Sequence, residues 1–266
     1  MPLALDYRDP WSTLERDPAI PRWRRHVDRV LESWCLRRTS LVIAVTSSIE
    51  KDLAPLRPVK VTMIPNAYDP GAFEEVVPTS FPRFTIVYAG NLYASRTAEP
   101  VLEALGFLRD RSRLPAGGLT LRVIGTTISE ILGHVARLDL GAYVELEHFL
   151  PYHEALARMK GADVLLLLVG TSHGGLIPAK LFDYLGARRF ILAVAPNGAE
   201  AAKLVTELGV GRCFVPADVE GIAGALAERF AASRDDLKPC VAASRFTAEE
   251  TMKDLDRHLR QILARP

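Results

Sequence analysis

The chain has 266 residues, of which 48% are hydrophobic and 24% are charged, and its formal net charge is +1. This composition is that of an ordinary soluble globular protein, and the near-neutral charge excludes a general electrostatic attraction to nucleic acid. The three cysteines lie far apart and form no CxxC pair, which argues against a structural zinc site and fits a reducing compartment. Because the longest apolar run is too short to span a bilayer and the start lacks the features of a signal peptide, we expect a cytoplasmic protein.

The first part of the chain combines short strands with one prominent helix. We expect strands at residues 3–7, 41–45 and 59–63, and a helix between the first two, where apolar residues recur at helical spacing. These apolar residues are Ile20, Trp23, Val27, Val30, Leu31 and Trp34. Two isolated parallel strands do not make a stable sheet. We therefore interpret this segment as the end of a domain whose opening strands are absent.

The same helical region is rich in arginine: Arg22, Arg24, Arg25, Arg29, Arg37 and Arg38. A basic amphipathic helix with tryptophans can bind an anionic membrane surface. The more common arrangement is an apolar stripe that faces the core, with the arginines in solvent. We favour the core-facing stripe and keep peripheral contact with the inner face of the membrane as the alternative.

From Arg83 onward, apolar strands alternate with helical stretches. The expected strands are 84–89, 119–124, 143–146, 164–168, 190–194 and 211–215. The expected helices are 97–110, 129–138, 153–160, 178–186, 198–208 and 219–232. Uninterrupted apolar runs indicate strands buried on both faces, and repeated strand–helix units indicate a parallel sheet with right-handed crossovers. Ligands of such sheets bind beyond the carboxyl ends of the strands, so we expect a site in those loops.

The most informative stretch runs from Leu176 to Gly186, with the sequence LIPAKLFDYLG. Pro178 suits the first position of a helix, which places Lys180 in the first turn and Asp183 three residues later on the same face. A glycine loop followed by a helix N-terminus and a lysine makes a natural anion site. The carboxylate one turn further can accept hydrogen bonds from a hydroxyl-bearing ligand. The combination predicts a nucleoside diphosphate bound through its phosphates and its ribose.

Neighbouring loops supply the other candidate ligand-binding residues. Gly90 and Asn91 follow the strand at 84–89, and Arg96 lies close to the next helix, where it either reaches a phosphate or is solvated. We expect further contacts to the same ligand from Gly125, Thr126, Phe149, Leu150, His173, Gly174, Gly175 and Leu181. The plainer alternative for each is a surface or turn residue, and for Asp183 it is an ion pair with Lys180. The acidic pairs at 145/147 and 235/236 are explained by strand or surface polarity, so we expect no metal site.

Five motifs, in this order, carry a resemblance to a known family: DYRDPW at 6–11, VIAVT at 42–46, IPNAYD at 64–69, VYAGNL at 87–92 and PAKLFDYL at 178–185. Their order and spacing resemble the retaining GT-B glycosyltransferases, in particular the large family four. The resemblance implies an α/β fold with a Rossmann-like parallel-sheet donor domain and an incomplete remnant of the N-terminal domain. Asp183 stands where the second of two family glutamates would be, and Gly175 stands where the first would be.

The resemblance also implies a domain organisation. Residues 1–64 would be the remnant of the N-terminal acceptor domain, and 65–82 would be the interdomain linker. Residues 83–245 would form the nucleotide-sugar-binding domain, and 246–266 a C-terminal helix that packs back on the N-terminal part. Thr247 and Glu250 form a capping-box pattern at the start of that helix.

The implied activity is a retaining, metal-independent transfer of a sugar from a nucleoside diphosphate donor to a glycan or lipid-linked acceptor, without a cofactor, as in polysaccharide biosynthesis. Lys180 would act in catalysis by stabilising the departing diphosphate. The acceptor side would be completed by a separate acceptor-domain chain or by a homo-oligomer. The alternative is a non-catalytic nucleotide-binding or interaction module derived from the same fold. A third option is a GT-B-shaped epimerase, which would require acid–base residues on the N-terminal domain, of which this sequence holds only the final portion.

Overall fold

The structure is a computed structural model that describes residues 2–9, 11–12, 20–56, 58–92, 96–111, 114–115, 117–125, 128–170, 176–232 and 241–264. The chain forms two compact units. The first unit comprises Met1–Ala67, Gly175–Ile177 and Arg245–Pro266, and the second comprises Tyr68–Gly174 and Pro178–Ser244.

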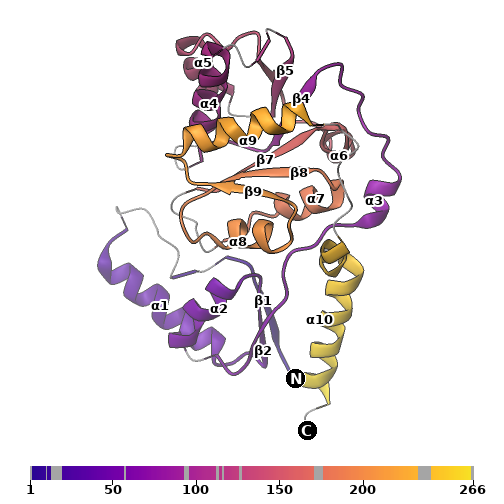
Figure 1. The fold of residues 1–266 in the computed structure, drawn as a ribbon. Coiled ribbons are helices and arrows are strands. Elements are labelled where there is room, and N and C mark those ends of the chain that lie inside the picture. Colours follow the sequence, from indigo (N-terminus) through magenta and orange to yellow (C-terminus); the bar gives the residue numbers. More distant parts are fainter. Residues whose placement is uncertain are drawn as a thin grey trace. The chain divides into compact units, whose positions relative to one another are not determined.

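The second unit is built on a six-stranded sheet in which every pair of neighbours is parallel (Figure 1). Its strands are β4 (Phe84–Ala89), β5 (Leu119–Ile124), β6 (Val144–Glu147), β7 (Val164–Leu168), β8 (Phe190–Val194) and β9 (Gly211–Phe214). The spatial order is β6-β5-β4-β7-β8-β9. The chain therefore enters the sheet at its centre, builds outward to β6, and returns to the centre at β7. The expected α/β fold with parallel sheets is confirmed.

Helices connect these strands and cover the sheet. They are α4 (Glu99–Asp110), α5 (Ile128–Arg137), α6 (Tyr152–Gly161), α7 (Lys180–Ala187), α8 (Glu200–Glu207) and α9 (Val219–Ala231). All five residues of β7 are apolar and buried, as expected of a central strand with helices on both faces. Leu105 of α4 and Leu226 of α9 belong to the same buried cluster as β4 and β7. Each fully buried leucine contributes about 1.5–3 kcal/mol through removal of its surface from water.

The first unit holds a three-stranded parallel sheet, β1 (Ala4–Tyr7), β2 (Leu41–Ala44) and β3 (Val61–Met63). Its helices are α1 (Arg22–Leu36), α2 (Ser47–Leu53) and α10 (Ala248–Leu263), with a 3-10 turn at Ala54–Leu56. A further 3-10 turn, Val241–Phe246, begins in the second unit and ends in the first. The side chains of Thr46 and Thr247 cap α2 and α10 by accepting hydrogen bonds from backbone N–H groups. One face of α10, with Leu255, Leu259 and Ile262, packs against Leu41, Ile43 and Ile64.

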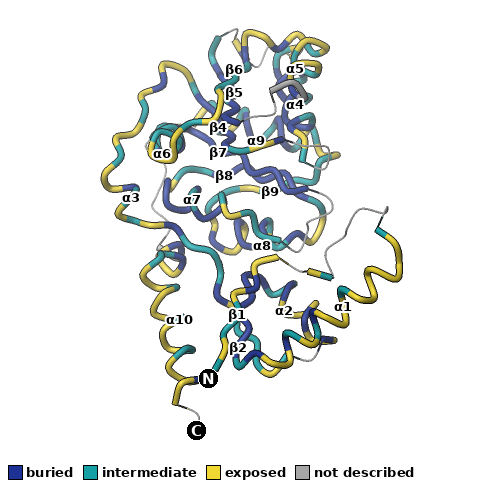
Figure 2. The backbone as a smooth tube through the Cα atoms, turned by 180° about the vertical axis from the view of Figure 1, so that it is seen from behind, coloured by how far each residue is buried: buried dark blue, intermediate teal, exposed yellow. Residues whose placement is uncertain are grey.

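The expectation of a core-facing apolar stripe on α1 is wrong. Trp23 is 69% exposed and Trp34 is 51% exposed, and Figure 2 shows most of the helix as exposed. The buried side of α1 instead carries Leu36 and Glu32. Glu32 accepts hydrogen bonds from the backbone N–H groups of Trp11 and Ser12, and burial raises the pKa of its carboxyl. This polar anchor and Leu36 decide which side of α1 faces the sheet, so the tryptophan side faces outward.

Candidate functional site

The strand order places a switch point at the centre of the second unit. Successive connections run outward from β4 on one side and from β7 on the other, and the two strands are neighbours. The loops that leave two such strands at their carboxyl ends diverge, which opens the crevice where open α/β sheets bind ligands. Gly90 follows β4, and α7 follows β7. The predicted glycine and the predicted lysine helix therefore belong to the two strands that flank the switch point.

The helix after β7 begins two residues later than the sequence suggests. Its first residue is Lys180, not Pro178. The N–H of Leu181 donates to the carbonyl of Pro178 at 2.9 Å, and the N–H of Phe182 donates to that of Ala179 at 3.0 Å. These three-residue hydrogen bonds make a tighter turn ahead of the α-helix. Lys180 still lies in the first turn, as predicted.

The ammonium group of Lys180 is enclosed beside β4. Its Nζ lies 4.1 Å from the centre of the Tyr88 ring, a distance suited to a cation–π interaction. A Cβ atom on residue 90 would lie 2.2 Å from this Nζ, and Gly90 has a φ of +137°. The positive φ favours glycine, because a side chain there would strain the backbone. A side chain would also displace the ammonium group from this position. Within the described part of the chain, Nζ is fully buried and has no hydrogen-bond partner.

The electrostatics of Lys180 favour an anion. Burial, and then the positive charge of Arg96, lower the pKa of the lysine to about 7. A buried ammonium that lacks hydrogen bonds and lies near a guanidinium is unfavourable by itself. A phosphate would supply both the missing acceptor and the missing negative charge. A negatively charged ligand bound near Lys180 and Arg96 would therefore stabilise both positive charges.

Asp183, also in the first turn of α7, is held by an aromatic residue that the motifs did not indicate. The hydroxyl of Tyr152, the first residue of α6, donates to Oδ1 of Asp183 at 2.9 Å. Burial raises the pKa of Asp183, while the hydrogen bond from Tyr152 lowers it. Asp183 is therefore partnered by Tyr152, and the expected alternative of an ion pair with Lys180 is not among the ion pairs of the described residues.

Tyr184 is a second residue that sequence reasoning missed. Its buried hydroxyl donates to the carbonyl of Leu166 in β7 at 3.1 Å and accepts from the N–H of Ala89 in β4 at 3.3 Å. One phenol therefore fixes α7 to both strands at the switch point. The available signal was its place directly after Asp183, which turns it toward the sheet when Asp183 faces the ligand side.

The remaining predicted residues lie in several different settings. Gly125 adjoins Gly90, because a Cβ at residue 125 would lie 2.3 Å from the Gly90 carbonyl oxygen. Phe149 is 76% exposed and Leu150 is half-buried on the loop after β6, whereas Leu181 is fully buried and its side chain belongs to the core. The carbonyl of Asn91 accepts from the Tyr88 hydroxyl at 2.9 Å. Four predicted residues lie outside the described residues: Thr126, His173, Gly174 and Gly175.

The acidic pair in β6 has a structural partner. Glu145 and Glu147 both form ion pairs with Arg122 of β5, and Glu147 also lies 3.4 Å from Arg158. The pair at 235/236 lies outside the described residues. Among the residues that the structure describes, no group of three or more His, Cys, Asp or Glu side chains is arranged to hold a metal ion.

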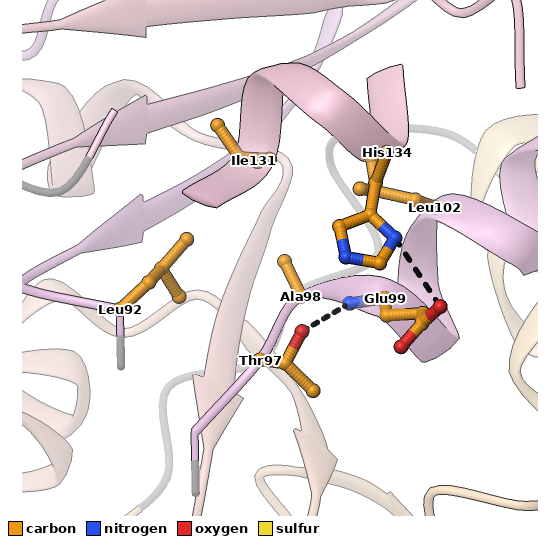
Figure 3. Close-up of a pocket in the computed structure, with 7 residues that line it drawn as sticks. All are labelled: Leu92, Thr97, Ala98, Glu99, Leu102, Ile131 and His134. Carbon is orange, nitrogen blue, oxygen red and sulfur yellow. Dashed lines mark hydrogen bonds and ion pairs between the residues drawn. The ribbon is translucent and has the colours of Figure 1, made fainter. Parts of the chain in front are cut away.

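A small pocket lies near the start of α4 and is lined by Leu92, Thr97, Ala98, Glu99, Leu102, Ile131 and His134 (Figure 3). In this pocket Nδ1 of His134 lies 3.2 Å from the Glu99 carboxylate. The cavity volume is about 10 Å³, room for about one water molecule and far below the ~300–1,000 Å³ of most small-molecule sites. Neither Lys180 nor Asp183 lines it, so this pocket and the anion site are separate features.

Comparisons with known proteins identify the fold. No family model matches the chain, and no curated protein matches it in sequence. Among solved structures, sucrose-phosphate synthase from Thermosynechococcus elongatus is 17% identical with a TM-score of 0.70, covering 98% of this chain and 68% of that one. HepE from Anabaena, in complex with UDP-glucose, is 16% identical with a TM-score of 0.71, covering 98% and 72%. Trehalose 6-phosphate synthase from Burkholderia multivorans is 13% identical with a TM-score of 0.72, covering 99% and 67%. The chain has the GT-B glycosyltransferase fold.

In this GT-B chain, the described site has three chemical features. A cation, Lys180, has no hydrogen-bond partner among the described residues and lies beside a strand end where Gly90 leaves room for its ammonium group. A carboxylate, Asp183, follows on the same helix. Such a set can bind an anion that also carries hydroxyl groups. Within the described residues of this GT-B chain, no helix is both long enough and apolar enough to cross a membrane.

Proposed function

We propose that this chain binds a nucleoside diphosphate-sugar and acts as a glycosyltransferase. The observation that carries the proposal is the enclosed Nζ of Lys180, which lies next to Gly90 at the switch point and has no hydrogen-bond partner in the described part of the chain. The GT-B fold supports it, and two neighbours of that fold are HepE in complex with UDP-glucose and the pneumococcal transferase GtfA in complex with UDP and GlcNAc.

Different residues of the site would bind different parts of the donor. Lys180, with Arg96 nearby, would bind the diphosphate and stabilise the negative charge that grows on it as the sugar departs. Asp183 would accept hydrogen bonds from the ribose hydroxyls, and the exposed Phe149 would lie against the base. We further propose that transfer is retaining and needs neither a metal ion nor a cofactor, as the family resemblance implies.

Lys180→Ala tests the anion site. Loss of one charge-assisted hydrogen bond should weaken the binding of UDP, GDP or ADP by about 1.5–3 kcal/mol, which is roughly 10- to 100-fold. The melting temperature should stay nearly unchanged, because the packing lost with the lysine side chain is offset by the removal of an unfavourable buried charge. Isothermal titration gives the affinity, and Lys203→Ala, an exposed lysine on α8, is the matched control. Equal affinity of the Lys180 variant and the wild type would remove Lys180 from the site.

We propose a glycan or lipid-linked acceptor, and a polysaccharide pathway in the cytoplasm or at the inner face of the membrane. One structural neighbour, WaaG, is a glycosyltransferase involved in lipopolysaccharide biosynthesis. A separate acceptor-domain chain or a second copy would complete the acceptor side. Co-purification with a small α/β partner supports this arrangement, whereas turnover of a nucleotide-sugar by a pure monomer contradicts it.

The competing function is a non-catalytic nucleotide-binding module. The observation that favours it is Gly175, which stands where the related glycosyltransferases carry a glutamate. Nucleotide binding without donor hydrolysis, and without transfer when glycan and lipid-linked acceptors are supplied, would identify the module. Hydrolysis of a UDP-, GDP- or ADP-sugar would identify the enzyme.

A further inference from the structure

The contact between Tyr152 and Asp183 joins two helices that are far apart in sequence. Tyr152 begins α6 and Asp183 lies in the first turn of α7, and their side chains meet in a hydrogen bond of 2.9 Å. Tyr152 is 55% exposed. It therefore borders solvent, on the side of the sheet where the loops after the strands lie.

In this pair Tyr152 is the hydrogen-bond donor and Asp183 is the acceptor. Burial and the neighbouring Asp183 raise the pKa of Tyr152, with Asp69 acting in the same sense. The phenol therefore remains a neutral donor throughout the physiological pH range. Asp183, whose pKa is raised by burial, is also near the buried Tyr184. Its carboxylate would be easier to protonate if the donor from Tyr152 were removed.

A carboxylate has two oxygens and about four acceptor positions. Tyr152 occupies a position on Oδ1, which leaves Oδ2 and the other lone pair of Oδ1 for a ligand. An aspartate has a short side chain with two rotatable bonds, so one fixed oxygen determines the direction of the other. A diol needs two acceptors in a defined direction, and the hydrogen bond to Tyr152 supplies that direction.

We infer that Tyr152 is a positioning residue that holds Asp183 ready for the ribose diol of the donor nucleotide and so gives the site a preference for ribonucleotides over deoxyribonucleotides. This inference rests on the proposed function. A site built to hydrogen-bond a hydroxyl group discriminates against the analogue that lacks it, because its own polar group is then left unpaired. Removing the phenol loosens Asp183 and weakens this discrimination.

Tyr152→Phe tests the inference, because it removes the hydroxyl and keeps the ring. Isothermal titration would use whichever of UDP, GDP and ADP binds tightest, and its 2′-deoxy counterpart. We expect the variant to bind the ribonucleotide about 3- to 10-fold more weakly, the size of one ordinary hydrogen bond. Binding of the deoxynucleotide should change less, so the ratio between the two affinities falls. In acid, the variant should lose ribonucleotide affinity at a higher pH than the wild type, because Asp183 is protonated more easily.

Two variants serve as controls. Tyr143→Phe removes a buried tyrosine hydroxyl immediately before β6, at the amino end of the sheet, and should leave both affinities unchanged. Asp183→Asn should lower the ribose preference by itself, and adding Tyr152→Phe to it should have little further effect, because the two residues act as one unit.

The outcomes distinguish a failure of the proposed nucleotide binding from a failure of the positioning role of Tyr152. If the wild type binds none of the three nucleotides, the proposed function fails and this inference fails with it. Suppose that the wild type binds a ribonucleotide, but Tyr152→Phe keeps the wild-type ratio of ribonucleotide to deoxyribonucleotide affinity and loses ribonucleotide affinity at the same acidic pH. Tyr152 then has no positioning role, and the inference alone is overturned. A lower melting temperature with an unchanged ratio would assign the hydrogen bond to stability only and would also overturn it.

Discussion

Lys180 shows how a small set of neighbours changes the chemistry of one side chain. The Tyr88 ring and the space left by Gly90 admit the ammonium group, while burial and Arg96 oppose its charge. The two residues that the sequence selected, Lys180 and Asp183, both lie in the first turn of one helix. Tyr152 was not foreseen, because its partner is 31 residues away and the pairing exists only through the packing of α6 on α7.

The lowered pKa of Lys180 predicts a pH-dependent affinity. With a pKa of about 7, the lysine is protonated and attracts phosphate at pH 6, and it is mostly neutral at pH 8. The affinity for a nucleoside diphosphate should therefore fall as pH rises through 7, by at most about tenfold per pH unit. Titration calorimetry between pH 6 and 8 measures the trend. Lys180→Ala provides the baseline, since it retains the ionisation of the nucleotide itself, and parallel curves for the two proteins would exclude Lys180 as the titrating group.

At the scale of elements, α7 is fixed by close packing as well as by Tyr184. A Cβ atom on Gly186 would lie 2.4 Å from the Phe73 ring and 2.7 Å from the Tyr68 ring. These two rings contact each other edge to face, with centroids 6.0 Å apart, and Phe73 belongs to the short helix α3 (Pro70–Glu74). The glycine therefore allows α3 to approach α7, which carries the anion site.

Gly186→Ala should accordingly destabilise the protein. Forcing a methyl group into this contact should lower the free energy of unfolding by about 1–3 kcal/mol, although alanine is the better helix former. Gly106→Ala in α4 is the matched control, because a Cβ there meets nothing within 4 Å, and it should be neutral or stabilising. Chemical denaturation measures both variants. Equal stabilities of the two would mean that α3 and α7 adjust without cost.

Helix α1 is the element whose buried side was predicted wrongly from the sequence. Periodicity located the apolar stripe, but periodicity does not reveal which side of a helix meets the sheet when a buried carboxylate such as Glu32 competes with the stripe. The outward stripe contains Trp23 and Trp34, and the guanidinium of Arg38 lies 3.9 Å from the centre of the Trp34 ring. Tryptophans on an apolar face with surrounding arginines fit an anionic lipid surface.

We propose that α1 binds such a surface. Flotation with vesicles of phosphatidylglycerol and phosphatidylcholine should recover the protein, and vesicles of phosphatidylcholine alone should recover much less. Replacing Trp23 and Trp34 by serine should abolish recovery, whereas Met252→Ser on the exposed side of α10 should not. Failure of the wild type to float would contradict the proposal. If the wild type proves to be a dimer and the double variant a monomer, the stripe belongs to the contact with a second copy of the chain instead.

At the scale of the whole molecule, alternating apolar runs were sufficient to predict the parallel α/β architecture. Strands buried on both faces, such as β7, leave a continuous apolar signal, and their expected bounds agree with the structure. Strand order leaves no such signal, because it depends on how the crossovers pack. The ends of helices were less certain, as the turn at Pro178 shows. The sequence therefore predicts the strands and helices better than the order of the strands and the packing between elements.

The central entry of the chain into its larger sheet has a consequence for synthesis. The backbone N–H of Thr85 bonds to the side chain of Asp163, 78 residues later, and β4 pairs with β7 at the same place. Until β7 has emerged from the ribosome, one edge of the apolar strand β4 has no partner within the sheet. At about 5–20 residues per second, this interval lasts roughly 4–16 s. An apolar strand edge is most prone to aggregate in that state, so the yield of folded protein should depend on how quickly the ribosome translates the codons between β4 and β7.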